Sequence, residues 1–210
     1  WMERVTWLDG APEPTQAEVV AMAAALGASP EAAKESAAKA LPLIRAALRG
    51  ACGGALRRDR YDARPGVARV HNERAFDLFV PRAALATGAA AASRAGDQPA
   101  VGADAGDAHA PVRLCGRFDR LVVGREGGAD GAPGRALWAE VLDFKTDAID
   151  AGNADAIAQR TAHYAPQMQA YRAAAAALLA LPPERVDCTL LFVRADTTVS
   201  VPRAESAPVR

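Results

Sequence analysis

The sequence predicts an α/β domain in which helices flank a mixed β-sheet, preceded by an N-terminal helical region. Three observations support this fold class. The first fifty residues carry helix start and stop signals, the segments 70–81, 112–123 and 136–144 have strand-like patterns, and a long helical repeat precedes a fourth apolar run at 186–194. The order strand, strand, strand, helix, strand is typical of a layered α/β or α+β domain.

The N-terminal helices follow from their capping signals. Thr15 and Glu18 form a capping-box pattern before a run of Ala, Val and Met. A Ser-Pro-Glu start at 29–31 predicts a second helix. We expect it to run to about Gly50 and to be bent or broken at Pro42.

The chain is expected to divide into a helical region, 1–65, and a core, 66–210. The Ala/Gly/Asp-rich stretch 83–110 is predicted to be a flexible insertion. The Gly-rich loop 124–134 joins the second and third strands, which predicts an antiparallel hairpin. The polar tail after Ala195 is expected to be loosely held.

Charge, cysteine content and hydropathy limit the class of protein that the chain can belong to. Acidic and basic residues balance at 25 each, so no overall field attracts nucleic acid, and any such binding must come from local clusters. Cys52, Cys115 and Cys188 show no metal-type spacing, and we expect buried free thiols. No signal peptide or membrane span is evident, which favours the cytoplasm. Because the chain begins with Trp1, we expect a piece of a longer polypeptide.

Three side chains suggest metal-dependent phosphodiester cleavage. Asp143 and Lys145 are two residues apart on a predicted strand and therefore project to the same face. Asp119, on the neighbouring hairpin strand, can reach the same patch. Two carboxylates and a strand carbonyl form a hard oxygen site that suits Mg²⁺ or Mn²⁺. The lysine could orient water or offset phosphoryl charge.

The long helix predicted at 154–181 adds a polar face. Tyr164, Gln167 and Tyr171 are spaced by three and four residues and so share one side of this helix. An amide and two phenols facing the metal patch could hold a sugar-phosphate strand or stack on a base.

These motifs carry a resemblance. The order G-R-F-D-R, V-L-D-F-K-T and Y-x-x-Q-x-x-x-Y resembles the PD-(D/E)XK nuclease superfamily, and more narrowly the C-terminal nuclease domain of AddA/RecB-type helicase-nucleases. The E-R-A-F segment 73–76 is similar to the E-x-P-F strand of that family. The likeness covers residues 70–194.

The resemblance implies a restriction-endonuclease-like fold and DNA cleavage with Mg²⁺ or Mn²⁺. It implies that Asp119 and Asp143 are metal ligands assisted by the carbonyl of Phe144, that Lys145 is the catalytic lysine, and that the 164–171 helix face contacts DNA.

The resemblance also implies partners. The substrate would be single-stranded DNA ends during double-strand-break repair and recombination. A helicase motor in the same polypeptide and a partner nuclease subunit would act with the nuclease, and no membrane would be involved. Some relatives hold an iron–sulfur cluster with four cysteines, and three scattered cysteines argue against one here.

The chain departs from the family in one motif. The usual G-x-x-x-H segment does not occur, and neither His71 nor His109 matches it. Either that segment lies upstream of Trp1, or a ligand has been lost. A non-catalytic DNA-binding module and a stand-alone nuclease of mobile-element or CRISPR type therefore remain alternatives. Glu73 could reach the site or form a salt bridge with Arg74 or Arg69.

Overall fold

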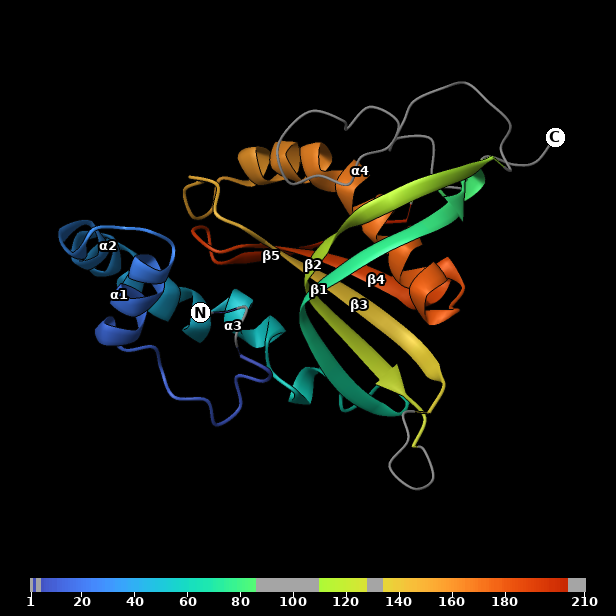
Figure 1. Cartoon of the computed structure of the whole chain (residues 1–210), viewed down its shortest axis with the longest axis horizontal. Helices are drawn as coiled ribbons and strands as arrows, with labels where there is room; N and C mark the ends of the chain where they lie inside the picture. The colour runs from blue at the N-terminus through green and yellow to red at the C-terminus, as the bar shows by residue number, and fades with distance from the viewer. Residues whose placement is uncertain (1, 3–4, 86–109, 128–133, 204–210) are drawn as a thin grey trace. The chain divides into compact units, whose positions relative to one another are not determined.

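The computed structural model describes residues 2, 5–85, 110–127 and 134–203. Within them the chain forms helices followed by a five-stranded mixed sheet in the order β1-β2-β3-β4-β5, with one long helix against it (Figure 1). The predicted α/β class is confirmed. The elements are α1 (Gln16–Ala25), α2 (Pro30–Arg49), α3 (Ala51–Ala55), η2 (Asp59–Tyr61), β1 (Val67–Pro81), η3 (Arg82–Ala84), β2 (Pro111–Arg125), β3 (Ala136–Lys145), α4 (Ala154–Leu179), η6 (Pro183–Arg185), β4 (Val186–Phe192) and β5 (Thr197–Ser200).

The chain forms two compact units. The first comprises Trp1–Ala63, Phe144–Asn153 and Leu191–Thr198, and the second comprises Arg64–Asp143, Ala154–Leu190 and Val199–Arg210. The predicted insertion at 83–110 lies outside the described residues, apart from its two ends. None of the helices in the described part of the chain is long and apolar enough to cross a membrane.

In the first unit, the predicted helix starts are confirmed. Thr15 Oγ1 accepts a hydrogen bond from the Glu18 amide at 3.2 Å, and the Glu18 carboxylate accepts one from the Thr15 amide at 2.8 Å. The bonds that the Thr15 amide and hydroxyl donate to this carboxylate hold the pKa of Glu18 below its usual range. The second helix runs through Pro42 without a break, so the alternative of a broken helix is wrong. Its inner face packs Ala37 and Leu41 against Val19 of α1.

In the second unit, β1 and β2 form a long, strongly twisted antiparallel pair (Figure 1). β2 also pairs antiparallel with β3, as the hairpin prediction required. Side chains alternate between the two faces, and one face of the pair packs against α4. There the rings of Phe76 and Phe118 lie 4.6 Å apart, and Tyr171 meets Phe118 edge-on at 5.4 Å.

Two expectations are corrected. The tail is not loose at its start, because Thr197–Ser200 forms β5 and the Val201 amide donates to the Cys188 carbonyl at 2.8 Å. This strand is short and polar, so it shows no apolar alternation in the sequence. Cys52 and Cys188 are buried free thiols as expected, but Cys115 is exposed because it projects from the other face of β2, away from α4.

Candidate active site

The strand register sets Asp119 and Asp143 side by side. Arg120 pairs with Leu142 across β2 and β3, so the next position along each strand holds Asp119 and Asp143. Directly opposite residues in an antiparallel pair point to the same face, with Cβ atoms about 4.5–5.5 Å apart. Two carboxyl groups therefore project together from one face of the sheet in the second unit.

The two carboxyl groups differ in their exposure to solvent. Asp143 is 2% exposed, whereas Asp119 is half-buried. Further along the same face of β2, Leu121 is buried, and in the opposite direction Arg117 is exposed.

β3 ends two residues beyond Asp143. The alternation of the strand turns Lys145 to the same face as Asp143 and Phe144 to the other. Both Phe144 and Lys145 are half-buried, and the Lys145 carbonyl accepts a hydrogen bond from the Val193 amide at 2.9 Å within the first unit.

The polar residues of α4 lie in the buried layer between this helix and the sheet. Gln167 Nε2 donates a hydrogen bond to Tyr171 Oη at 3.1 Å, and both side chains are buried. Tyr171 contacts the ring of Phe118, which is adjacent to Asp119 in the chain. Tyr164 is half-buried beside His163, at a ring distance of 5.0 Å. Cys188 of β4 points to the Met168 carbonyl of α4, whereas its neighbour Thr189 bonds Glu140 on the other side of the sheet, so alternation along β3 turns Asp143 to the α4 side.

Glu73 lies beside this site with a specific local geometry. It occupies β1 between Asn72 and Arg74, which pair with Arg120 and Phe118 on either side of Asp119. Its φ is +51°, a left-handed value that a side chain other than glycine adopts at a cost. Its carboxylate forms an ion pair with Arg117 at 2.7 Å, and not with Arg69 or Arg74 as the sequence suggested.

Several buried polar residues near the site escaped sequence reasoning. Arg120 has no exposed surface, and its guanidinium donates to Asn72 Oδ1 at 3.3 Å. Glu140 is 2% exposed and accepts a hydrogen bond from Thr189 Oγ1 at 2.7 Å. The signal that could have revealed these residues in the sequence is a charged side chain within an otherwise apolar strand. Burial of such a group is costly unless it is hydrogen-bonded, which is what the structure shows.

The donor chemistry of the carboxyl pair fits Mg²⁺ or Mn²⁺. Magnesium is a hard cation that takes oxygen ligands, and proteins commonly hold it through one or two carboxylates while it keeps several waters. Among the described residues, no group of three or more His, Cys, Asp or Glu side chains could hold a metal ion. The pair therefore suits a hydrated hard cation, and it does not resemble a closed zinc cage.

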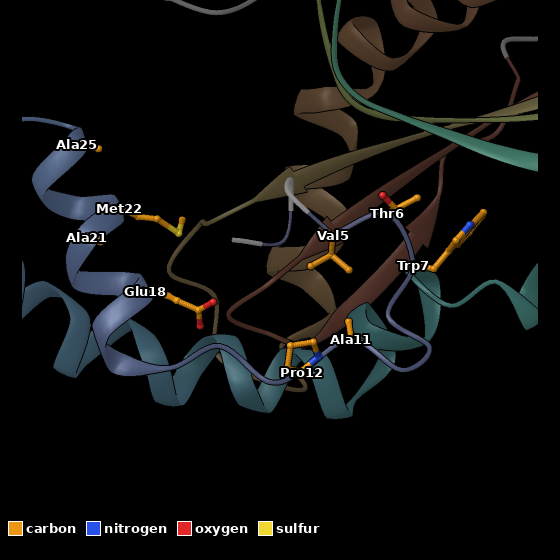
Figure 2. A pocket seen from close by; sticks show the side chains of 9 residues that line it. All are labelled: Val5, Thr6, Trp7, Ala11, Pro12, Glu18, Ala21, Met22 and Ala25. Carbon is orange, nitrogen blue, oxygen red and sulfur yellow. The ribbon is translucent and has the colours of Figure 1, made fainter.

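A separate cavity of about 560 Å³ lies in the first unit. Figure 2 shows it between α1 and the segment that precedes this helix, with Met22 on one side and Val5 and Trp7 on the other. Its one charged side chain, Glu18, already caps α1. None of the candidate site residues lines this cavity, so it is unrelated to the carboxyl pair.

A carboxyl pair on adjacent strands, followed by a lysine in an α/β fold, is the kind of donor set that metal-dependent phosphodiester cleavage requires. The chain matches the family model of the PD-(D/E)XK nuclease superfamily over residues 1–209. It therefore belongs to that superfamily, whose members typically use a divalent metal. No curated protein matches the chain.

Proposed function

We propose that this chain is a Mg²⁺-dependent DNA nuclease that acts as the exonuclease domain of an AddA/RecB-like helicase-nuclease. The observation that supports the nuclease activity is the register of Arg120 against Leu142, which brings Asp119 and Asp143 to neighbouring positions, with Lys145 following on the same strand. The narrower assignment rests on the order of the G-R-F-D-R, V-L-D-F-K-T and Q-x-x-x-Y motifs. Its substrate would be single-stranded DNA ends in double-strand-break repair, supplied by a helicase motor.

The residues divide the chemistry between them. Asp119, Asp143 and the Phe144 carbonyl would hold the cation. When bound, Mg²⁺ or Mn²⁺ supplies Lewis-acid stabilisation of the charge that develops on the phosphate. The Lys145 ammonium would orient the attacking water and offset phosphoryl charge. A bond forms between the water oxygen and phosphorus while the opposite phosphorus–oxygen bond breaks, and the leaving oxygen takes up a proton.

The helical motif has a different task in this proposal. Tyr164 is half-buried and can still present its ring to a DNA strand. Gln167 and Tyr171 are buried against β1 and β2, so they would support DNA binding by fixing α4 on the sheet.

The test is cleavage of a fluorescent single-stranded oligonucleotide in Mg²⁺ by three purified variants. Asp143→Asn and Lys145→Ala should each lose at least about a hundredfold in rate, because they remove electrostatic stabilisation of the transition state. Asp59→Asn, which alters an exposed aspartate of the first unit, serves as the matched control and should cleave normally. Circular dichroism checks folding. Full activity in Asp143→Asn would refute the assignment.

A non-catalytic DNA-binding module is the second candidate. The absence of a three-residue ligand cluster among the described residues favours it. Mn²⁺ titration followed by electron paramagnetic resonance separates the two functions. A nuclease should bind Mn²⁺ and lose that binding in the Asp119→Asn/Asp143→Asn double variant. A module that binds DNA should show the same weak Mn²⁺ signal in both proteins and cleave nothing.

A further inference from the structure

A row of buried polar side chains crosses four strands of the second unit. It consists of Asn72 of β1, Arg120 of β2, Glu140 of β3 and Thr189 of β4, and we call this set the polar row. The Arg120 guanidinium donates to Asn72 Oδ1 at 3.3 Å, and Thr189 Oγ1 donates to Glu140 at 2.7 Å. Arg120 has no exposed surface and is the largest fully buried side chain among the described residues.

The polar row lies directly behind the carboxyl pair. Arg120 follows Asp119 in β2 and therefore projects from the other face of that strand. It is paired with Leu142 of β3, the residue before Asp143. Glu140 is two positions from Leu142 and is therefore the diagonal neighbour of Arg120. A buried cation and a buried anion share one face of the sheet, and the two aspartates of the site project from the other.

The β2–β3 ladder ends at Arg120. Its pairs run from Arg125 to Arg120, so Asp119 and Asp143 stand one position beyond the last of them. On the other side of β2, the pairing with β1 passes over Glu73, whose φ is +51°. The two carboxyl groups also repel each other, because like charges at neighbouring strand positions are unfavourable. The nearest fixed point of all three strands is therefore the row that contains Arg120.

Stability gives no reason for a charge at Arg120. Leu121, Val122 and Leu142 beside it are buried and apolar. Taking a guanidinium out of water is costly, and well-packed apolar residues in place of buried charges are often neutral or stabilising. What an arginine adds is direction. Its planar fork bonds Asn72 of β1 and its charge attracts that of Glu140 on β3, so it fixes three strands at one row.

We propose that Arg120 is a positioning residue of the cation site. It holds β1, β2 and β3 at the last paired row, so that Asp119 and Asp143 stay close enough to share one Mg²⁺ or Mn²⁺. This rests on the proposed nuclease function. Arg120 acts through the two carboxyl groups and touches neither the substrate nor the cation. Its loss therefore lowers the affinity for the cation, whereas a saturating concentration of cation restores the arrangement and with it the rate.

The test combines a Mg²⁺ titration of cleavage with Mn²⁺ binding followed by electron paramagnetic resonance. Arg120→Met should raise both the Mg²⁺ concentration for half-maximal cleavage and the dissociation constant for Mn²⁺ about 10–100-fold, the range for residues that orient metal ligands. The rate at saturating Mg²⁺ should stay within about threefold of the unmodified protein, because the chemical groups are intact. Arg120→Lys keeps the charge and a donor for Asn72, and should recover most of the affinity.

Arg172→Met is the matched control. Arg172 is also a buried arginine of the second unit, 4% exposed, but its guanidinium donates to the carbonyls of Val186 and Val201. Its loss should destabilise the fold without changing the affinity for Mn²⁺. Equal weakening of Mn²⁺ binding in Arg172→Met and Arg120→Met would show that Arg120 contributes general stability alone, and would overturn the proposal.

A double variant keeps the test decisive if Arg120→Met does not fold. That change leaves Glu140 as an uncompensated buried charge, which is strongly destabilising. Arg120→Met/Glu140→Gln removes both charges and keeps an oxygen that accepts from Thr189. It should be folded by circular dichroism and still bind Mn²⁺ about 10–100-fold more weakly than the unmodified protein. Normal Mn²⁺ affinity in this variant contradicts the proposal. If neither variant folds, Arg120 serves the fold and not the site.

The outcomes separate the two proposals. If cleavage depends on Asp143 but Arg120→Met has normal cation affinity, the positioning role is wrong and the nuclease stands. If Mn²⁺ binding depends on both Asp143 and Arg120 but no DNA is cleaved, the positioning role stands and the nuclease is wrong. If the unmodified protein binds no Mn²⁺, both are refuted.

Discussion

The amide of Gln167 donates a hydrogen bond to the hydroxyl of Tyr171, 3.1 Å away, in the buried layer between α4 and the sheet. The Tyr171 ring meets Phe76 and Phe118 edge-on, at 5.9 and 5.4 Å. Because Phe118 precedes Asp119, this contact fixes the strand that carries the first carboxyl group. The four-residue spacing of Gln167 and Tyr171 thus has a physical meaning in this chain, because both side chains hold α4 on the strands that it covers.

Tyr171→Phe separates the hydrogen bond from the ring packing. It removes the acceptor of the Gln167 amide but keeps the aromatic contacts, and should lower the free energy of unfolding by about 1 kcal/mol. Tyr171→Ala removes both and should cost about 3–5 kcal/mol. Urea unfolding of the two variants measures the difference. Equal losses would show that the ring contributes little.

Arg172 ties the chain after β5 to α4. It is 4% exposed, and its guanidinium donates to the carbonyls of Val186 at 3.1 Å and Val201 at 2.8 Å. Arg172→Met leaves those carbonyls without a buried donor and should cost about 2–4 kcal/mol in urea unfolding. Lys34→Met, at an exposed position of α2, should stay within about 0.5 kcal/mol. A loss no larger than that of the control would contradict this role.

Glu73 should reverse the usual preference between alanine and glycine. In a strand, glycine is normally worse than alanine by about 0.5–1 kcal/mol. At Glu73 the left-handed backbone penalises any side chain, so Glu73→Gly should be more stable than Glu73→Ala by about 1 kcal/mol. Ala75→Gly, two residues on, should show the ordinary order and destabilise. Thermal unfolding of the three variants checks this, and the same order at both positions would exclude strain at Glu73.

Cys188 should make stability fall at alkaline pH. Burial raises the pKa of its thiol to about 12, whereas an unfolded thiol titrates near about 8.5. Between these values the unfolded state has lost the proton that the folded state retains, so unfolding becomes more favourable as pH rises. The contribution is fully present below about pH 8.5 and declines by about 1.4 kcal/mol per pH unit above it.

The measurement is the free energy of unfolding between pH 8 and 10.5 in the unmodified protein and in Cys188→Ala. The variant should lose less stability over this range, whatever its absolute stability after the removal of a sulfur atom from the core. Parallel curves for the two proteins would show that Cys188 does not titrate on unfolding.

Local sequence patterns were sufficient to predict most of the helices and strands. Capping signals at Thr15 and Ser29 placed the first helices, because a cap depends on residues within one turn. Alternation placed β2 and β3 and turned Asp143 and Lys145 to one face. β5 was missed, since its four residues are held by pairing with a neighbouring strand and not by their own pattern.

Sequence alone determined which residues could form a site, because strand alternation and helical spacing are properties of the local backbone. Only the tertiary structure decided how they combine. Strand register brought Asp119 and Asp143 to neighbouring positions, packing of α4 buried Gln167 and Tyr171 against the sheet, and the strand pairing brought Glu73 to Arg117. Each of these depends on contacts between segments far apart in the chain, which no local pattern of residues encodes.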